Sequence, residues 1–295
     1  MVKAYITYGQ GIGCDKEAAL AYRLAGAEVE KLHFSQIGEL LKRIKGTQGH
    51  ILNFSGGFLH GDVLGAGMCA ANELMPQRDA MRAFAEEGNV IYGQCNGFQV
   101  LVKLGLLPGN EKDLQTVTLT HNIGGMYRVA PILHLPERRE GKVHFAFEGI
   151  TELFYLWCRH GEGKLVFYDP HGSVDLTTVS DTHERVDTRH VLLRYVTPEG
   201  KVAVAEDFPH NPNGSALGIA GLVDATGNIF GHMAHTETSI QHWQDVRHGD
   251  AMEILRRRGV RAEDRETGLE ELLGIPIGLQ IFRNIVQHVQ RNAGE

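Results

Sequence analysis

The segment from Val90 to Leu101 constrains this chain most, because it combines a strand, a tight turn and a helix in immediate succession. A short β-branched run leads into Gly93-Gln94-Cys95-Asn96-Gly97, and an apolar segment with helical periodicity follows. This is the layout of a nucleophile elbow, in which a reactive side chain stands on a sharp strand-to-helix turn. The segment therefore predicts an α/β fold and makes Cys95 a candidate nucleophile.

The residues beside Cys95 give this interpretation a physical basis. The central residue of an elbow has a strained backbone, and neighbours without a Cβ relieve the crowding around it. The helix that follows directs its positive end at the sulfur, which favours the thiolate. A single cysteine in such a place is more often an inert core residue, but glycines at positions 93 and 97 favour the nucleophile.

The first half of the chain alternates strand-like and helix-like segments at short intervals. Runs at 2–8, 28–32 and 50–54 precede the strand at Val90, and helix signals lie between them. Alternation of this kind predicts a mostly parallel sheet with helices on both faces. Residues 114–207 hold β-rich runs among charged loops, where we expect Pro131 and Pro136 at a sheet edge or at strand ends.

Composition narrows the possible partners and compartments. The 295 residues carry a net charge of −7 without a dense Lys/Arg stripe, so nucleic acid is not expected as the main partner. Neither a signal peptide nor an apolar run of membrane-spanning length is readable, so no membrane contact is expected. Four cysteines without paired spacing indicate neither a disulfide framework nor a zinc site. We expect a cytoplasmic protein with reduced thiols.

Two further motifs can meet Cys95 in space. Gly56-Gly57-Phe58 follows a strand, and parallel strands deliver their following loops to one edge of the sheet. The backbone N–H groups of Gly57 and Asn96 could then form an oxyanion hole, although glycines in a flexible loop are the plainer alternative. Late in the chain, His235 and Glu237 face the same way if their segment is extended. They would serve as a base and its orienting carboxylate.

The turn Gly9-Gln10-Gly11-Ile12-Gly13 imitates a dinucleotide-binding fingerprint, but Cys14 stands where the third glycine is required. A lone match of this kind is weak evidence for nucleotide binding. The Gly-Lys pairs of the chain are not followed by Ser or Thr, so a Walker A motif is absent from the sequence. Neither turn therefore predicts an ATP site in this chain.

Together these motifs resemble class I glutamine amidotransferases. The Cys-Asn-Gly-Phe-Gln sequence is most similar to the nucleophile motif of the glutaminase components of phosphoribosylformylglycinamidine synthase. The Gly-Gly-Phe-x-x-Gly-Asp turn, the His-x-Glu pair at a late strand end and Cys14-Asp15 agree with that family, where we expect a structural role for the last pair. The resemblance covers nearly the whole chain and implies one flavodoxin-like domain over residues 1–295.

The resemblance implies hydrolysis of glutamine to glutamate and ammonia by a Cys95, His235 and Glu237 triad. Further residues with implied substrate-binding roles are Gly56, Phe58, Gln99, His160, Gly161 and Glu162. It implies no metal or organic cofactor in this chain. The ammonia would pass to a synthetase subunit that holds ATP and magnesium and makes formylglycinamidine ribonucleotide from formylglycinamide ribonucleotide, with a small third subunit in some complexes.

Two departures from the family pattern stand out. The family usually reads Pro-His-Pro-Glu-Arg where this chain reads Ala-His-Thr-Glu-Thr, which keeps the pair but puts the rigidity of its turn in doubt. Residues of about 241–275 form an insertion in which we expect a solvated surface helix. Two alternatives stay open from the residues alone, namely a glutamine or γ-glutamyl hydrolase of another pathway and a non-catalytic scaffold of the same fold.

Overall fold

The computed structural model describes residues 1–109, 115–167 and 188–294. Its strands are β1 (Lys3–Tyr8), β2 (Glu28–His33), β3 (His50–Phe54), β4 (Val90–Gln94), β5 (Val117–Thr120), β6 (Arg128–Pro136), β7 (Arg138–Arg139), β8 (Lys142–Val143), β9 (Phe154–His160), β10 (Lys164–Phe167), β11 (Val191–Tyr195), β12 (Ile219–Val223), β13 (Ile229–His232) and β14 (Ala234–His235). Its α-helices are α1 (Asp15–Leu24), α2 (Ile37–Arg43), α3 (Met68–Leu74), α4 (Arg78–Glu86), α5 (Asn96–Lys103), α6 (His248–Arg257), α7 (Arg265–Leu273) and α8 (Ile277–Asn292).

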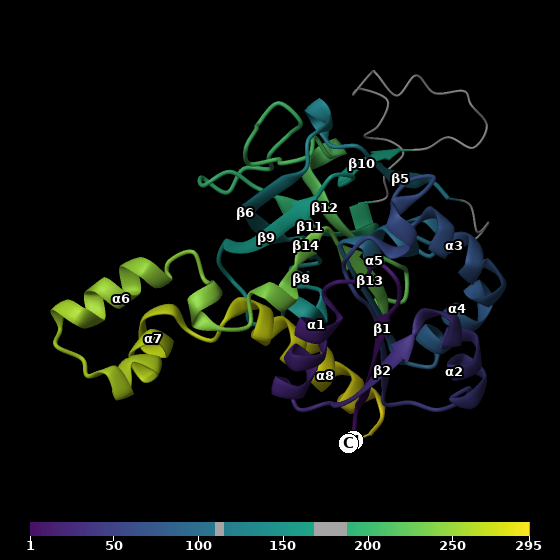
Figure 1. Ribbon diagram of the computed structural model, residues 1–295, viewed down its shortest axis with the longest axis horizontal. Coiled ribbons are helices and arrows are strands. Elements are labelled where there is room, and N and C mark those ends of the chain that lie inside the picture. Colours follow the sequence, from purple (N-terminus) through teal and green to yellow (C-terminus); the bar gives the residue numbers. More distant parts are fainter. Residues whose placement is uncertain (110–114, 168–187, 295) are drawn as a thin grey trace.

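One half of the main sheet is parallel and confirms the expected flavodoxin-like fold. Its order is β2-β1-β3-β4-β13, and each neighbouring pair in it is parallel. Because side chains alternate along a strand, Ala4 packs on one face with residues of α1 and α8. Tyr5 packs on the other face with residues of α2, α4 and α5. Helices therefore cover both faces, as Figure 1 shows.

The other half of the sheet is antiparallel, and its last strand, β14, follows its first strand, β13, almost directly in the sequence. It runs from β13 through β12, β11, β6 and β9 to β14. Only Met233 separates β13 from β14 in the sequence, yet β14 stands at the far end of the strand order and pairs with β9. This half must therefore curl, and the curl carries His235 back to the neighbourhood of β4.

Strand β6, which contains Pro131, is not an edge strand of the sheet, so the expected edge position is wrong for the strand as a whole. Strand β6 lies between β9 and β11 in the sheet. It pairs with β9 from Arg128 to His134 but with β11 only from His134 to Pro136. At Pro131 the strand has a neighbour on one side only, so the missing N–H can be accommodated without losing a ladder hydrogen bond there. Pro136 ends the strand, as expected.

The insertion forms a two-helix arm of α6 and α7 that projects from the body, on the left in Figure 1. Ala251, Leu255 and Leu269 form a small apolar cluster of its own within the arm. His242 joins the arm to its base, because its Nδ1 lies 2.6 Å from Glu266 Oε1 and its Nε2 lies 2.9 Å from the Gly274 carbonyl oxygen. The expected surface helix is thus one half of a helical pair. No described helix has the length and apolar character required to span a membrane.

Candidate active site

Cys95 stands at the junction of β4 and α5 with a backbone conformation that non-glycine residues rarely adopt. Its φ is 50° and its ψ is −110°, which is the strain expected of an elbow nucleophile. The glycines two residues away have the expected steric role. A Cβ on Gly97 would lie 2.1 Å from the Phe54 carbonyl oxygen, and one on Gly93 would lie 2.7 Å from Leu101 Cδ1. The predicted elbow is therefore present.

His235 and Glu237 form a buried hydrogen-bonded pair. The distance from His235 Nδ1 to Glu237 Oε1 is 2.6 Å. The expected extended segment is wrong in one respect, because β14 ends at His235 and Glu237 lies in the 3-10 turn Thr236–Thr238. The tight turn, rather than strand alternation, thus brings the two side chains together. This pairing leaves His235 Nε2 without a hydrogen-bond partner among the described residues.

The protonation of His235 is governed by two opposed influences. Burial by itself lowers the pKa of this imidazole, but the Glu237 carboxylate raises it, with smaller contributions from Cys95 and Cys14, and the net pKa lies well above the usual value. A stabilised imidazolium is what a leaving amine requires of its proton donor. The pair is therefore suited to general acid–base work beside a thiol.

Gly56 separates the nucleophile from the histidine. A Cβ placed on this residue would lie 2.8 Å from His235 Cε1 and 3.3 Å from Cys95 Cβ. The structure thus brings together the three residues predicted as a triad, although they come from strand ends far apart in the sequence. The absence of a side chain at position 56 permits their approach, and the substrate-binding role expected for this glycine stays a prediction.

The predicted oxyanion donors lie at the same edge of the sheet. The turn after β1 is joined to the turn after β3, because Phe58 N–H donates to the Gly11 carbonyl (2.7 Å) and Gly13 N–H to that of Gly56 (3.2 Å). These bonds do not use the Gly57 N–H. Asn96 is the first residue of α5, where backbone N–H groups have no partner within the helix. The roles of Gly57 and Asn96 stay predictions.

The turn that lacks the family's prolines is anchored by buried hydroxyl groups. Thr236 Oγ1 lies 2.8 Å from the Tyr92 hydroxyl and 3.2 Å from His232 Nε2. The Tyr92 hydroxyl lies 2.7 Å from His232 Nε2. All three side chains are fully buried. A hydrogen-bond network that proline could not form therefore holds this turn in place.

The predicted loop at His160 lies beside the Cys95 thiol, but the His160 side chain itself is buried. The Cys95 thiol donates to the Arg159 carbonyl oxygen, with 3.6 Å between sulfur and oxygen. His160 is buried, its Nδ1 lies 3.2 Å from Asn122 Oδ1, and desolvation lowers its pKa to about 3. Neutral His160 therefore supports the loop, and its contact with substrate stays a prediction, as does that of Gly161.

Gln99 and Glu162 connect α5 to this loop. Gln99 Nε2 donates to the Glu162 carbonyl (2.6 Å), and Gln99 Oε1 accepts from Asn96 Nδ2 (2.9 Å). The Glu162 carboxylate accepts from the Ala66 N–H (3.0 Å). Both ends of the Gln99 amide are bonded to protein groups, so Gln99 helps to position Asn96 and the loop. The substrate contacts predicted for Phe58, Gln99 and Glu162 stay predictions.

Two residues near the site were missed by sequence reasoning. The Tyr127 ring lies 6.1 Å from that of Phe58, and both are about half exposed at the rim. A Cβ on Gly161 would lie 3.6 Å from Tyr127 Cδ2, so the ring lies beside the predicted loop at His160. The irregular segment of Tyr127 carries no sequence signal. The second residue is Cys14, whose Sγ lies 3.6 Å from His235 Nδ1.

Cys14, His235 and Glu237 are the described residues whose donor atoms could together hold a metal ion. These atoms lie within 4.8 Å of one another. Burial, followed by the charges of Glu237 and Cys95, raises the pKa of Cys14 although His235 opposes this, so its sulfur is a neutral thiol rather than the thiolate that metals bind. His235 Nδ1 is already bonded to Glu237. The donor set fits acid–base catalysis better than metal binding.

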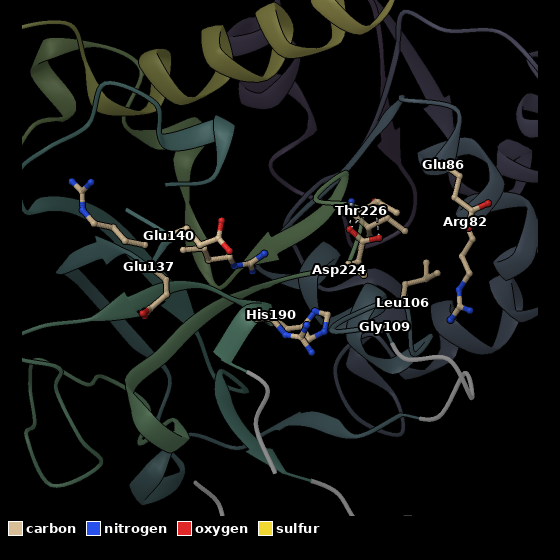
Figure 2. Close-up of a pocket in the computed structure, with 14 residues that line it drawn as sticks. Arg82, Glu86, Leu106, Gly109, Glu137, Glu140, His190, Asp224 and Thr226 are labelled. Atoms are coloured by element: carbon tan, nitrogen blue, oxygen red, sulfur yellow. Dashed lines mark hydrogen bonds between the residues drawn. The ribbon is translucent and has the colours of Figure 1, made fainter. Parts of the chain in front are cut away.

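A separate cavity of about 830 Å³ lies beside the strand ends that are opposite to those at Cys95 (Figure 2). Its lining includes Ile229, the first residue of β13, and Asp224 and Thr226 from the preceding turn. Cys95 follows the other end of β4, which is parallel to β13. None of the predicted site residues lines this cavity.

Comparisons with known proteins give a consistent result. Residues 1–264 match the CobB/CobQ-like glutamine amidotransferase domain. The chain is 36% identical over 247 residues to phosphoribosylformylglycinamidine synthase subunit PurQ of Dehalococcoides mccartyi, covering 83% of this chain and 89% of that protein. It is 32% identical over 292 residues to the protein of the same name from Methanococcus maripaludis, at 98% coverage of both. The solved structure of PurLQS from Thermotoga maritima has the same fold, with a TM-score of 0.60 and 24% identity over 97% of this chain and 98% of that one.

Proposed function

Because the chain belongs to the CobB/CobQ-like glutamine amidotransferase family, we propose that it is the glutaminase subunit of a phosphoribosylformylglycinamidine synthase. The subunit hydrolyses glutamine and supplies ammonia for purine biosynthesis. The observation that carries the proposal is the approach of the His235–Glu237 pair to the strained Cys95 elbow across Gly56. A scaffold without catalysis would have no need for this arrangement.

The chemistry follows from the positions of these groups. His235 takes the proton of the Cys95 thiol, and the sulfur attacks the side-chain amide carbon of glutamine. The N–H groups of Gly57 and Asn96 stabilise the oxygen of the tetrahedral intermediate. The imidazolium returns the proton to the leaving nitrogen, so ammonia departs and a thioester remains. Water, deprotonated by His235, then releases glutamate and restores the thiol.

Ammonia made here requires an acceptor on another chain. We assign ATP and magnesium to a synthetase partner, which converts formylglycinamide ribonucleotide to the amidine, with a small third subunit in the same cytoplasmic complex. Phe58, Met126 and Tyr127 are each about half exposed beside the site. Exposed apolar side chains in one place are typical of interfaces, so this rim is where we place the synthetase.

The test is to assay the full chain with and without a synthetase subunit from the same organism. We expect glutamate release in both cases and formation of formylglycinamidine ribonucleotide only with the synthetase, ATP and magnesium. The Cys95→Ala complex should make the amidine from added ammonia but not from glutamine. Glutamate release without amidine formation in any reconstituted mixture would assign the chain to another pathway.

A further inference from the structure

Cys14 occupies a position where its side chain would normally cap a helix. It is the N-cap of α1, a position that favours Ser, Thr, Asp or Asn because their oxygens accept from the first backbone N–H groups. The Cys14 side chain makes no such hydrogen bond. Its sulfur lies instead 3.6 Å from His235 Nδ1, on the ring atom that also faces Glu237. The thiol therefore contributes to the catalytic pair rather than to the helix.

The backbone around Cys14 is bonded to the centre of the site. Gly13 and Cys14 N–H groups both donate to the Gly56 carbonyl oxygen, each at 3.2 Å. Gly56 is the residue across which Cys95 and His235 approach one another. The position of the Cys14 sulfur is thus set by the same turn that sets the spacing of the triad, and helix α1 packs against the Thr236–Thr238 turn from the same side.

The chemistry of the contact identifies what the sulfur can do. Glu237 Oε1 is the principal acceptor for the His235 Nδ1–H, at 2.6 Å. A sulfur at 3.6 Å from the same nitrogen is a weak second acceptor, which makes the hydrogen bond three-centred. Glu237 is wholly buried, and its Oε2 has no partner among the described residues. Buried carboxylates depend strongly on each remaining polar neighbour, and the thiol is one within 4.8 Å.

We propose that Cys14 is a positioning residue for glutamine hydrolysis, whose sulfur shares the His235 Nδ1–H with Glu237 and so holds the imidazole with Nε2 toward Cys95. The proposal rests on the proposed function and adds a residue to it. In this proposal Cys14 acts through its contact with His235. The imidazolium is a stronger N–H donor than the neutral ring and gains more from a second acceptor at Nδ1, so the thiolate–imidazolium form of the site is the state that Cys14 favours.

The experiment compares Cys14→Ala, Cys14→Ser and Cys14→Val in the full chain. The first readout is the rate at which iodoacetamide alkylates Cys95 between pH 5 and 10, followed by peptide mapping. We expect Cys14→Ala to slow alkylation about fivefold near neutral pH, the size of one weak hydrogen bond. Ser keeps an acceptor and should restore most of the rate, whereas Val fills the space without an acceptor and should not. Cys69→Ala is the matched control, because Cys69 lies on α3 and its thiol donates to the Val63 carbonyl.

The second readout is steady-state glutamine hydrolysis by the complex with the synthetase. Cys14→Ala should lower kcat with little change in KM, and the alkaline side of its pH profile should move to lower pH. The proposal is overturned if Ala behaves like the unsubstituted chain, or if Val restores both readouts as well as Ser does. A chain that releases no glutamate under any condition would refute the proposed function, and the alkylation rates would still decide the role of Cys14.

Discussion

The hydroxyl of Tyr92 lies 2.8 Å from the hydroxyl of Thr236, across 144 residues of sequence. Tyr92 belongs to β4, which ends at the nucleophile, and Thr236 stands between the two members of the catalytic pair. One buried hydrogen bond therefore joins the strand of Cys95 to the turn of Glu237. The relative position of thiol and base depends on it.

Tyr92→Phe and Thr236→Val should each lower the free energy of unfolding by about 1 kcal/mol, because each removes hydrogen bonds from a buried network in which His232 Nε2 remains as a partner of the other hydroxyl. The loss in the double variant should differ from the sum of the two, since both changes remove the contact between the hydroxyls and together they leave His232 Nε2 without either partner. Urea denaturation of the four proteins measures this coupling. Strictly additive losses would show that the two hydroxyls do not depend on each other.

Cys95→Ala should reduce glutamine hydrolysis by at least about a thousandfold, because members of a catalytic triad act as a unit. Glutamate release by purified protein is the measurement. Cys69→Ala serves as the control and should keep most of the activity, since this cysteine lies on α3 and its thiol donates to the Val63 carbonyl. Residual hydrolysis of more than a few per cent in the Cys95 variant would contradict the elbow assignment.

Gly56→Ala should lower kcat by on the order of a hundredfold while the protein stays folded. The new methyl group would meet His235 Cε1 at 2.8 Å, so the imidazole must move, and displacements of about an ångström have effects of this size. Gly249→Ala in the arm is the matched control, because beyond its own helix backbone and chain neighbours its Cβ would meet no atom of the described residues within 4 Å. Equal activity of the two variants would remove Gly56 from the centre of the site.

Glu237→Gln should move the alkaline side of the kcat profile to lower pH and reduce the maximal rate. Burial lowers the pKa of His235 and the Glu237 carboxylate raises it. The amide keeps the burial and removes the charge, so the pKa falls and the imidazolium that protonates ammonia is lost at a lower pH. Glu237→Asp keeps the charge and should change the rate more than the profile. An unshifted profile in the Gln variant would show that Glu237 does not control this proton.

The parts of this molecule that depend on local sequence could be predicted from it. The elbow at Cys95 needs Gly93 and Gly97 within two residues on either side, and such short-range steric demands are visible in the sequence. The parallel half of the sheet follows from alternating elements of ordinary length. The class of fold and the family follow from these motifs, and the comparisons agree with both.

The parts that depend on long-range contacts could not be predicted. Nothing near Cys14 indicates that its sulfur meets His235, 221 residues away. Thr236 looks like the loss of a rigid proline until Tyr92 and His232 are found against it. The arm was foreseen as extra sequence with a helix, but its second helix and its attachment through His242 follow from tertiary packing.

The curl that sets β14 beside β9 has a consequence for biosynthesis of the protein itself. During translation the nucleophile emerges long before its base, and β14 takes its place only by pairing with β9, which is made about 75 residues earlier. Contacts of such high sequence separation are slow to form, because loop-closure entropy opposes them. A nascent or truncated chain would thus display a cysteine without a proton acceptor. Ammonia production would begin only after β14 has paired with β9 and brought His235 to Cys95. The strand topology therefore delays the onset of activity until the fold is complete.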